Sequence, residues 1–121
     1  MILAYWCVLV AGLLPYVATG IAKSQKGFDN VNPRDWLAKQ EGFRARAHAA
    51  QLNSFEAFPF FAAAVIVSQL RGAPVDTVNM LAIIFVVARA AYIACYVANL
   101  ASLRSVAWFV GIGCVVAMFF V

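Results

Sequence analysis

Four long apolar segments make up most of the chain, and they constrain its fold more than any other feature. They run over about residues 2–22, 43–70, 76–97 and 103–121. Hydrophobic residues are 65% of the 121 residues and charged residues only 12%, whereas a soluble domain is about half apolar and about a quarter charged. Because so much apolar surface cannot be hidden in one small core, the segments are predicted to lie in a lipid bilayer.

Backbone N–H and C=O groups in hydrocarbon must bond within the protein, which predicts helices rather than open strands. We therefore expect an all-α integral membrane protein. Residues 1–121 would form a single domain, an antiparallel bundle of four transmembrane helices. Two connections are short, and the third, residues 23–42, is a polar loop in which a short helix is expected at residues 35–40.

Basic residues gather on one side of this predicted bundle. The loop of residues 23–42 and the third connection, with their flanks, hold seven Lys and Arg residues, whereas the second connection holds only Arg71. Loops rich in Lys and Arg stay in the cytoplasm, which predicts a cytoplasmic loop and two extracytoplasmic termini. A multi-pass protein with such short loops and no targeting segment suits a bacterial inner membrane. Nucleic-acid binding is not expected, because the cations flank apolar segments rather than line a soluble face.

Metal binding is not expected either. The cysteines Cys7, Cys95 and Cys114 lie in apolar segments without metal-ligand spacing, and His48 has no second His or Cys near it. Free cysteine is commonly buried as a small hydrophobic residue. The cysteines are therefore predicted to pack in the bundle.

The second apolar segment carries polar residues that a lipid-facing helix would not tolerate. They are Arg44, Arg46, His48, Gln51, Asn53 and Glu56. At 100° per residue, Arg46, Asn53 and Glu56 share one face, and the other three lie on roughly the opposite face. Ionisable residues within a span usually face protein or a water-filled site and mark function.

The third segment has one matching stripe. Phe85, Arg89, Tyr92 and Tyr96 recur at i, i+4, i+7 and i+11. Arg89 needs a counter-charge, and Glu56 is the only acidic residue deep in any segment. An Arg89–Glu56 ion pair is therefore expected, either to orient two helices or to form part of a ligand site.

Asn53, Glu56 and Pro59 follow one another at intervals of three, after basic and His or Gln positions. In this setting they resemble the second-helix signature of the MAPEG family, the membrane-associated proteins of eicosanoid and glutathione metabolism. The resemblance extends to the spaced Arg and Tyr residues of the third segment and to Leu103-Arg104-Ser105 at the start of the fourth.

The resemblance implies a homotrimer that binds glutathione between neighbouring subunits, near the cytoplasmic side, and takes a lipophilic small molecule from the bilayer. The glutathione-binding positions that it implies are Gln51, Asn53, Glu56, Tyr92 and Tyr96, with Arg46 and Arg89 as further cations. Arg104 would stabilise the thiolate of glutathione, and Ser105 would assist with a hydrogen bond. These two are the expected catalytic residues.

The sequence also departs from the family pattern. Ala49 stands where glutathione-using members have an Arg, and Ala57 and Phe58 stand where a Tyr is often found. Two functions therefore stay open. One is a glutathione transferase or peroxidase acting on lipophilic electrophiles. The other is a non-catalytic protein of the same fold that binds lipid or serves as an accessory subunit.

Overall fold

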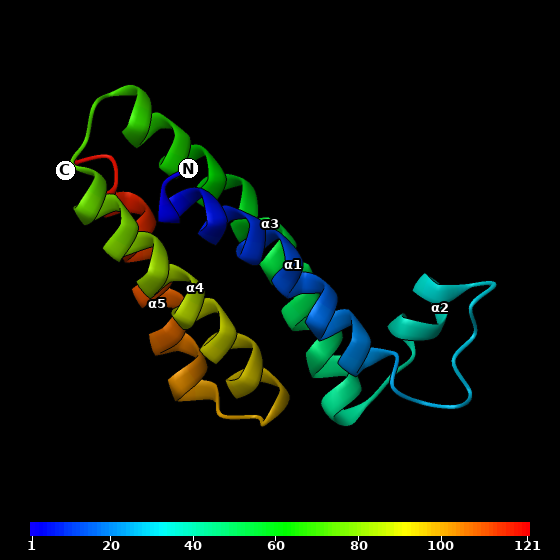
Figure 1. The fold of residues 1–121 in the computed structure, drawn as a ribbon. Helices are drawn as coiled ribbons and strands as arrows, with labels where there is room; N and C mark the ends of the chain where they lie inside the picture. Colours follow the sequence, from blue (N-terminus) through cyan, green and yellow to red (C-terminus); the bar gives the residue numbers. More distant parts are fainter.

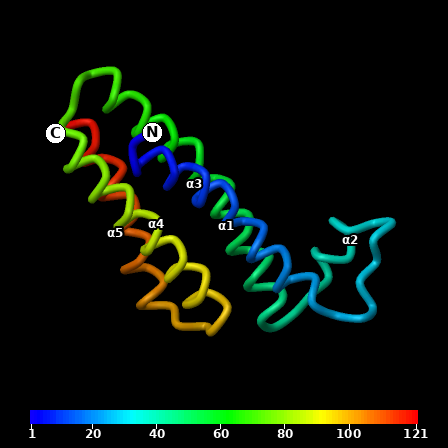
Figure 2. The backbone as a smooth tube through the Cα atoms, in the orientation of Figure 1, coloured from blue at the N-terminus to red at the C-terminus, as the bar shows by residue number.

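The computed structural model describes residues 1–121 and consists of five helices joined by turns. The four long helices are α1 (Leu3–Ala22), α3 (Gly42–Leu70), α4 (Val75–Val97) and α5 (Ala101–Ala117), and they run antiparallel in sequence order (Figure 1). Both termini lie at one end of the bundle and the loop of residues 23–42 lies at the other (Figure 2). The first three long helices begin and end within one residue of the predicted bounds.

Both bounds of α2 (Pro33–Ala38) and both bounds of α5 differ from the prediction: α5 begins at Ala101, two residues early, and α2 ends at Ala38, two residues early. The fourth apolar segment was expected to be helical to residue 121, but α5 ends at Ala117 and a turn follows. The short helix α2 also begins two residues before its expected start. Pro33 explains this start, because its fixed φ and missing N–H suit the first helical position.

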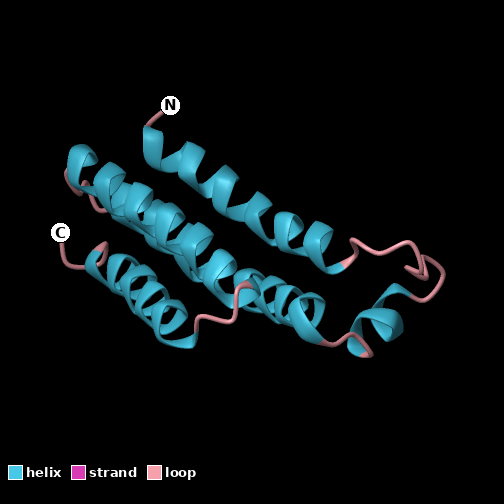
Figure 3. Ribbon diagram, turned by 90° about the horizontal axis from the view of Figure 1, so that it is seen from below, coloured by secondary structure: helices cyan, strands magenta, loops and turns pink.

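The long helices pack as two close pairs, α1 with α3 and α4 with α5. Helix α4 also contacts α1 and α3, whereas α5 touches α3 only slightly (Figure 3). Small residues allow the close approach of α1, whose buried residues recur every three or four positions. They are Ala4, Cys7, Ala11, Pro15, Ala18 and Ala22. Because α3 and α5 barely meet, the face of α4 between them is left accessible from one side.

Two tight turns fix how the helices follow one another. After α3, Gly72 has a φ of 76°, and Ala73 N donates to Ser68 O at 2.9 Å. After α4, Asn99 has a φ of 62°, and Leu100 N donates to Cys95 O at 2.8 Å. Both turns are Schellman motifs, in which a residue with positive φ ends the helix. The second turn sets the start of α5 close to the end of α4.

Three of the helices, α1, α3 and α4, are long and apolar enough to cross a membrane, and α5 is a shorter apolar helix. At 1.5 Å per residue, α3 is about 43 Å long and α5 about 25 Å. Many large apolar side chains are exposed on the outside of the bundle, among them Leu9, Val87 and Phe109. This surface suits a helical bundle that is solvated by lipid rather than by water.

Candidate functional site

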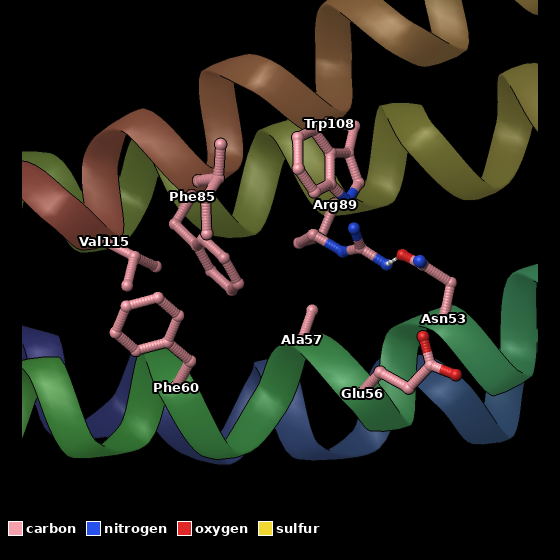
Figure 4. Close-up of a pocket in the computed structure, with 9 residues that line it drawn as sticks. Asn53, Glu56, Ala57, Phe60, Phe85, Arg89, Trp108 and Val115 are labelled. Carbon is pink, nitrogen blue, oxygen red and sulfur yellow. Dashed lines mark hydrogen bonds between the residues drawn. The ribbon is translucent and has the colours of Figure 1, made fainter.

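Arg89 is the most buried charged residue of the chain and lies at the centre of the candidate site. Only 4% of its surface is exposed. Its Nη2 donates to Asn53 Oδ1 of α3 at 2.9 Å (Figure 4). The same nitrogen donates to Ser54 Oγ, also on α3, at 3.2 Å. The Ser54 hydroxyl in turn donates to Ala50 O at 2.7 Å. These bonds join α4 to α3 through neutral partners.

The expected ion pair between Arg89 and Glu56 is therefore wrong for the chain in this structure. Ser54 and Glu56 are two positions apart on a helix, so their side chains point in nearly opposite directions. Arg89 bonds Ser54 and Asn53, and Glu56 lies about 60° further around α3 beyond Asn53. Glu56 is exposed, and its carboxylate lies on the open side of the gap between α3 and α5 (Figure 4).

A series of stacked side chains runs from Arg89 toward the start of α5, with two tyrosines between two arginines. The Arg89 Cζ lies 4.2 Å from the centre of the Tyr92 ring. The Tyr92 and Tyr96 rings meet edge to face with their centres 5.7 Å apart. Arg104 Cζ lies 4.6 Å from the centre of the Tyr96 ring. Cations over aromatic faces are attracted by the ring quadrupole, so this series holds two guanidinium groups in fixed positions.

A cavity of about 260 Å³ lies beside this series, and we call it the polar groove. Its lining residues are Asn53, Tyr92, Tyr96, Arg104, Ser105, Trp108 and Phe109. The groove offers an amide, two phenols, a hydroxyl and a guanidinium. Such a set suits a polar, anionic ligand.

A second cavity of about 180 Å³ continues from the polar groove toward the middle of the bundle, and we call it the inner cavity. Its lining residues are Asn53, Glu56, Ala57, Phe60, Phe85, Arg89, Trp108, Ile112 and Val115. Asn53 and Trp108 line both cavities. The two spaces therefore form one site, which is polar near Arg104 and mostly apolar near Val115.

The structure brings together seven of the nine residues predicted for the site. Asn53, Tyr92, Tyr96, Arg104 and Ser105 line the polar groove, and Glu56 and Arg89 line the inner cavity together with Asn53. The two other residues, Arg46 and Gln51, line neither cavity.

Arg46 is bound to the end of α4. Its Nε and Nη2 donate to Val97 O at 3.1 and 3.0 Å. Carbonyls in the last turn of a helix have no partner within the helix, and Val97 is the last residue of α4. Arg46 therefore satisfies this carbonyl and ties the end of α4 to the start of α3.

Gln51 lies on the side of α3 away from Asn53. Its Oε1 is 3.4 Å from His48 Nδ1. Ala49, where the resemblance implies an Arg, lies only 40° around the helix from Asn53 and is half-buried. The face of α3 toward the polar groove therefore has no cation at position 49.

Sequence reasoning did not assign a site role to Ser54 or Trp108. Ser54 is adjacent to Asn53, but a serine inside a helix usually bonds the backbone of its own helix. The sequence therefore gave no reason to expect its bond with Arg89. Trp108 has no polar residue beside it in the sequence that marks it as part of a site. Its spacing of four from Arg104 places both on one face of α5, and this spacing was the available signal. No group of three metal-binding side chains is present.

The MAPEG family model matches residues 3–121, essentially the whole chain. Neither a curated protein nor a solved structure matches the chain significantly. The family match covers all four long helices and both parts of the site. The fold, the apolar spans and the match agree, and the chain belongs to the MAPEG family.

Proposed function

We propose that this protein is a membrane glutathione transferase or peroxidase that acts on lipophilic electrophiles. The observation that supports it is the polar groove, where Arg104 stacks on Tyr96 beside Ser105, Tyr92 and Asn53. Family membership supplies the expectation of glutathione. The tripeptide would occupy the polar groove, and the lipophilic substrate would enter the inner cavity from the bilayer.

In this proposal Arg104 is the group that activates the thiol of glutathione. A guanidinium next to a thiol lowers the pKa of the thiol and raises the thiolate fraction at neutral pH. Ser105 and Tyr96 donate hydrogen bonds to the same sulfur, and Asn53 and Tyr92 hold polar groups of the peptide. With an aryl halide, the thiolate forms a C–S bond and the halide leaves. With a hydroperoxide, two glutathione molecules give one disulfide, one alcohol and one water.

The proposal includes a homotrimer in a bacterial inner membrane with both termini outside the cytoplasm. The site is open between α3 and α5, and Glu56 is exposed there within a helix that is long enough to span. A carboxylate in a span is costly against lipid. A neighbouring subunit would cover this opening and complete the site.

The test is a titration of glutathione into the detergent-solubilised protein, followed by the ultraviolet absorbance of the thiolate. We expect saturable thiolate absorbance at neutral pH and conjugation of a generic aryl halide. Arg104→Gln should abolish the thiolate signal while glutathione still binds. Arg34→Gln is the matched control, because Arg34 is an exposed cation on α2 outside the site. Absence of both thiolate and conjugation in the unmodified protein would refute the enzyme.

A second function, lipid binding or service as an accessory subunit without catalysis, is favoured by one observation. The family Arg is replaced by Ala49, and Arg46, one turn earlier, is already bound to Val97 O. Loss of one charge-assisted hydrogen bond costs about 1.5–3 kcal/mol, which weakens glutathione about ten- to a hundredfold. Lipid retained in the site, with no glutathione affinity, would favour this function.

A further inference from the structure

Cationic and aromatic side chains meet where α1 ends and α3 begins, on the side of the bundle that carries α2 (Figure 1). Lys23 Nζ lies 4.9 Å from the centre of the Phe28 ring. Arg44 Cζ lies 4.5 Å from the centre of the Phe43 ring. Arg44 Nη2 donates to Ser24 O at 3.3 Å, so its guanidinium reaches the residue next to Lys23. We call the surface formed by Lys23, Phe28, Phe43 and Arg44 the basic–aromatic patch.

The short helix α2 holds this patch against the bundle. Leu37 is buried and packs in one cluster with Ala22 of α1 and Ala47 of α3. Beside it, Trp36 meets the Phe28 ring edge to face, with the ring centres 5.0 Å apart. Both rings are half-buried. Rings of this kind are enriched at the boundary between hydrocarbon and headgroups, and here they are fixed beside a cation.

The lengths of two helices place the patch at the level of the lipid headgroups. Helix α1 has 20 residues and is about 30 Å long, which matches the hydrocarbon core of a bilayer. Lys23 follows directly after it. Helix α3 has 29 residues and is about 43 Å long, which matches a bilayer with its headgroups. Arg44 lies in its first turn, so both helices give the same depth.

The cations of the patch are not neutralised by a neighbouring acid of the loop. The hydrogen bond of Arg44 goes to a neutral carbonyl, and its Nε has no partner. Asp29 is the only acidic residue among residues 23–34. Its carboxylate accepts from Val31 N and Asn32 N at 3.0 and 3.3 Å, which stabilises the loop itself. The patch is therefore free to bind an external anion, and a guanidinium suits phosphate oxygens in particular.

We propose that the basic–aromatic patch binds the phosphate of an anionic phospholipid in the leaflet on the side of residues 23–42. The phosphate oxygens accept hydrogen bonds from the Arg44 guanidinium and the Lys23 ammonium. Neither residue lines the polar groove or the inner cavity, so the inference goes beyond the proposed function and does not depend on it.

Net charge selects an anionic phospholipid over a zwitterionic one. Each Lys or Arg near an anionic membrane surface strengthens binding about fivefold. Phosphatidylcholine offers the same phosphate, but its choline cation is repelled by Lys23 and Arg44. The aromatic rings beside these cations favour a phosphate that carries acyl chains over a phosphate in solution.

The experiment uses the full-length protein in phosphatidylcholine nanodiscs, with Trp36 as the reporter. Trp6→Phe and Trp108→Phe leave Trp36 as the single tryptophan, since the chain has 3. The probe is phosphatidylglycerol with brominated acyl chains, which quench the fluorescence of a nearby indole. Brominated phosphatidylcholine is the comparison. We expect half-maximal quenching at a mole fraction about tenfold lower for phosphatidylglycerol, as two nearby cations give. Equal quenching curves would overturn the proposal.

A pair of substitutions tests the two cations of the patch. Lys23→Gln combined with Arg44→Gln should remove the preference for phosphatidylglycerol. Arg34→Gln combined with Lys39→Gln is the matched control, because it removes the same charge from exposed positions of the same loop. The control should retain the preference. Equal loss in both double variants would show general attraction to an anionic surface and would refute a specific site.

A further variant keeps the test decisive if Arg44→Gln does not fold. Lys23→Glu retains the bond between Arg44 and Ser24 and should abolish the preference by itself. An unchanged preference in Lys23→Glu would refute the site. Inorganic phosphate at millimolar concentration should leave the quenching unchanged. Loss of the phosphatidylglycerol preference on its addition would assign the patch to a soluble anion and overturn the lipid.

Discussion

At the scale of single residues, Arg46 and Arg104 have different surroundings. Arg46 donates two hydrogen bonds to Val97 O, whereas Arg104 stacks on Tyr96 at the polar groove. Arg46 therefore acts as a positioning residue. It holds the end of α4, and with it the turn that places Tyr96 and Arg104.

Arg46→Ala should destabilise the protein without ligand by about 1.5–3 kcal/mol, the range for hydrogen bonds to a charged group. The measurement is the unfolding midpoint in detergent. The unfolding midpoint of Arg46→Lys should lie between those of Arg46→Ala and the unmodified protein, because an ammonium cannot reproduce the two bonds of a guanidinium. If Arg46 instead bound a ligand anion, the midpoint of the free protein would stay unchanged and only the shift produced by glutathione would be lost.

Ala49→Arg restores the cation that the face of Asn53 lacks. We expect glutathione affinity to rise about ten- to a hundredfold, the equivalent of one charge-assisted hydrogen bond. The thiolate titration measures this change. Ala45→Arg is the control, because it adds the same charge one turn closer to the polar loop. An equal gain in both variants would indicate general attraction of an anion rather than a specific contact.

At the scale of helices, a side chain of α4 caps the start of α1. Ala4 N donates to Asn79 Oδ1 at 2.9 Å, and no side chain within α1 caps this end. The first N–H groups of a helix need an external acceptor. Asn79 therefore connects the pair of α1 and α3 to the pair of α4 and α5 at the end opposite the polar groove.

Asn79→Ala should cost about 0.5–2 kcal/mol, as does loss of a helix cap, and the unfolding midpoint is again the measurement. Thiolate absorbance in the folded variant should be unchanged, because Asn79 lines neither cavity. Asn79→Ser keeps a short acceptor and serves as the control. Equal midpoints for Asn79→Ala and the unmodified protein would contradict a capping role.

Helix bounds were predictable where the chain carries a local stop signal. Gly72 and Pro74 mark the end of α3. Pro33 is a similar signal at the start of α2, but the prediction placed that helix two residues later. The end of α5 was predicted four residues late, because hydropathy continues past Ala117 without any such signal. The helix periodicity also grouped Asn53 with Glu56 and aligned Arg89 with Tyr92 and Tyr96.

What periodicity cannot give is the partner that a side chain reaches on another helix. The shared face of Arg46 and Asn53 is correct, yet Arg46 bonds a backbone carbonyl of α4 that no sequence pattern marks. Charge alone predicts Glu56 as the partner of Arg89, but in the structure Arg89 donates to Asn53 and Ser54. Both differences arise from the relative rotation of α3 and α4, which depends on packing of the whole bundle.

At the scale of the whole molecule, the loop of residues 23–42 lies at one end and both termini at the other. The excess of Lys and Arg near that loop predicts that it is cytoplasmic. A periplasmic-active phosphatase fused to the carboxyl terminus should be active, and a fluorescent protein that folds only in the cytoplasm should be dark there. The reverse result would invert the orientation.

The open side of the site leads to the last prediction, the assembly. Leu52 and Glu56 are exposed on the face of α3 beside the gap, and a carboxylate there requires protein or water rather than lipid. We expect native mass spectrometry to show three chains. In a Cys95→Ser background, Leu52→Cys should form disulfide-linked dimers within the trimer on mild oxidation. Val106→Cys, exposed on the outer face of α5, should not. Monomers by mass, or cross-links through residue 106 but not through residue 52, would place the subunit interface elsewhere and leave Glu56 without its expected cover.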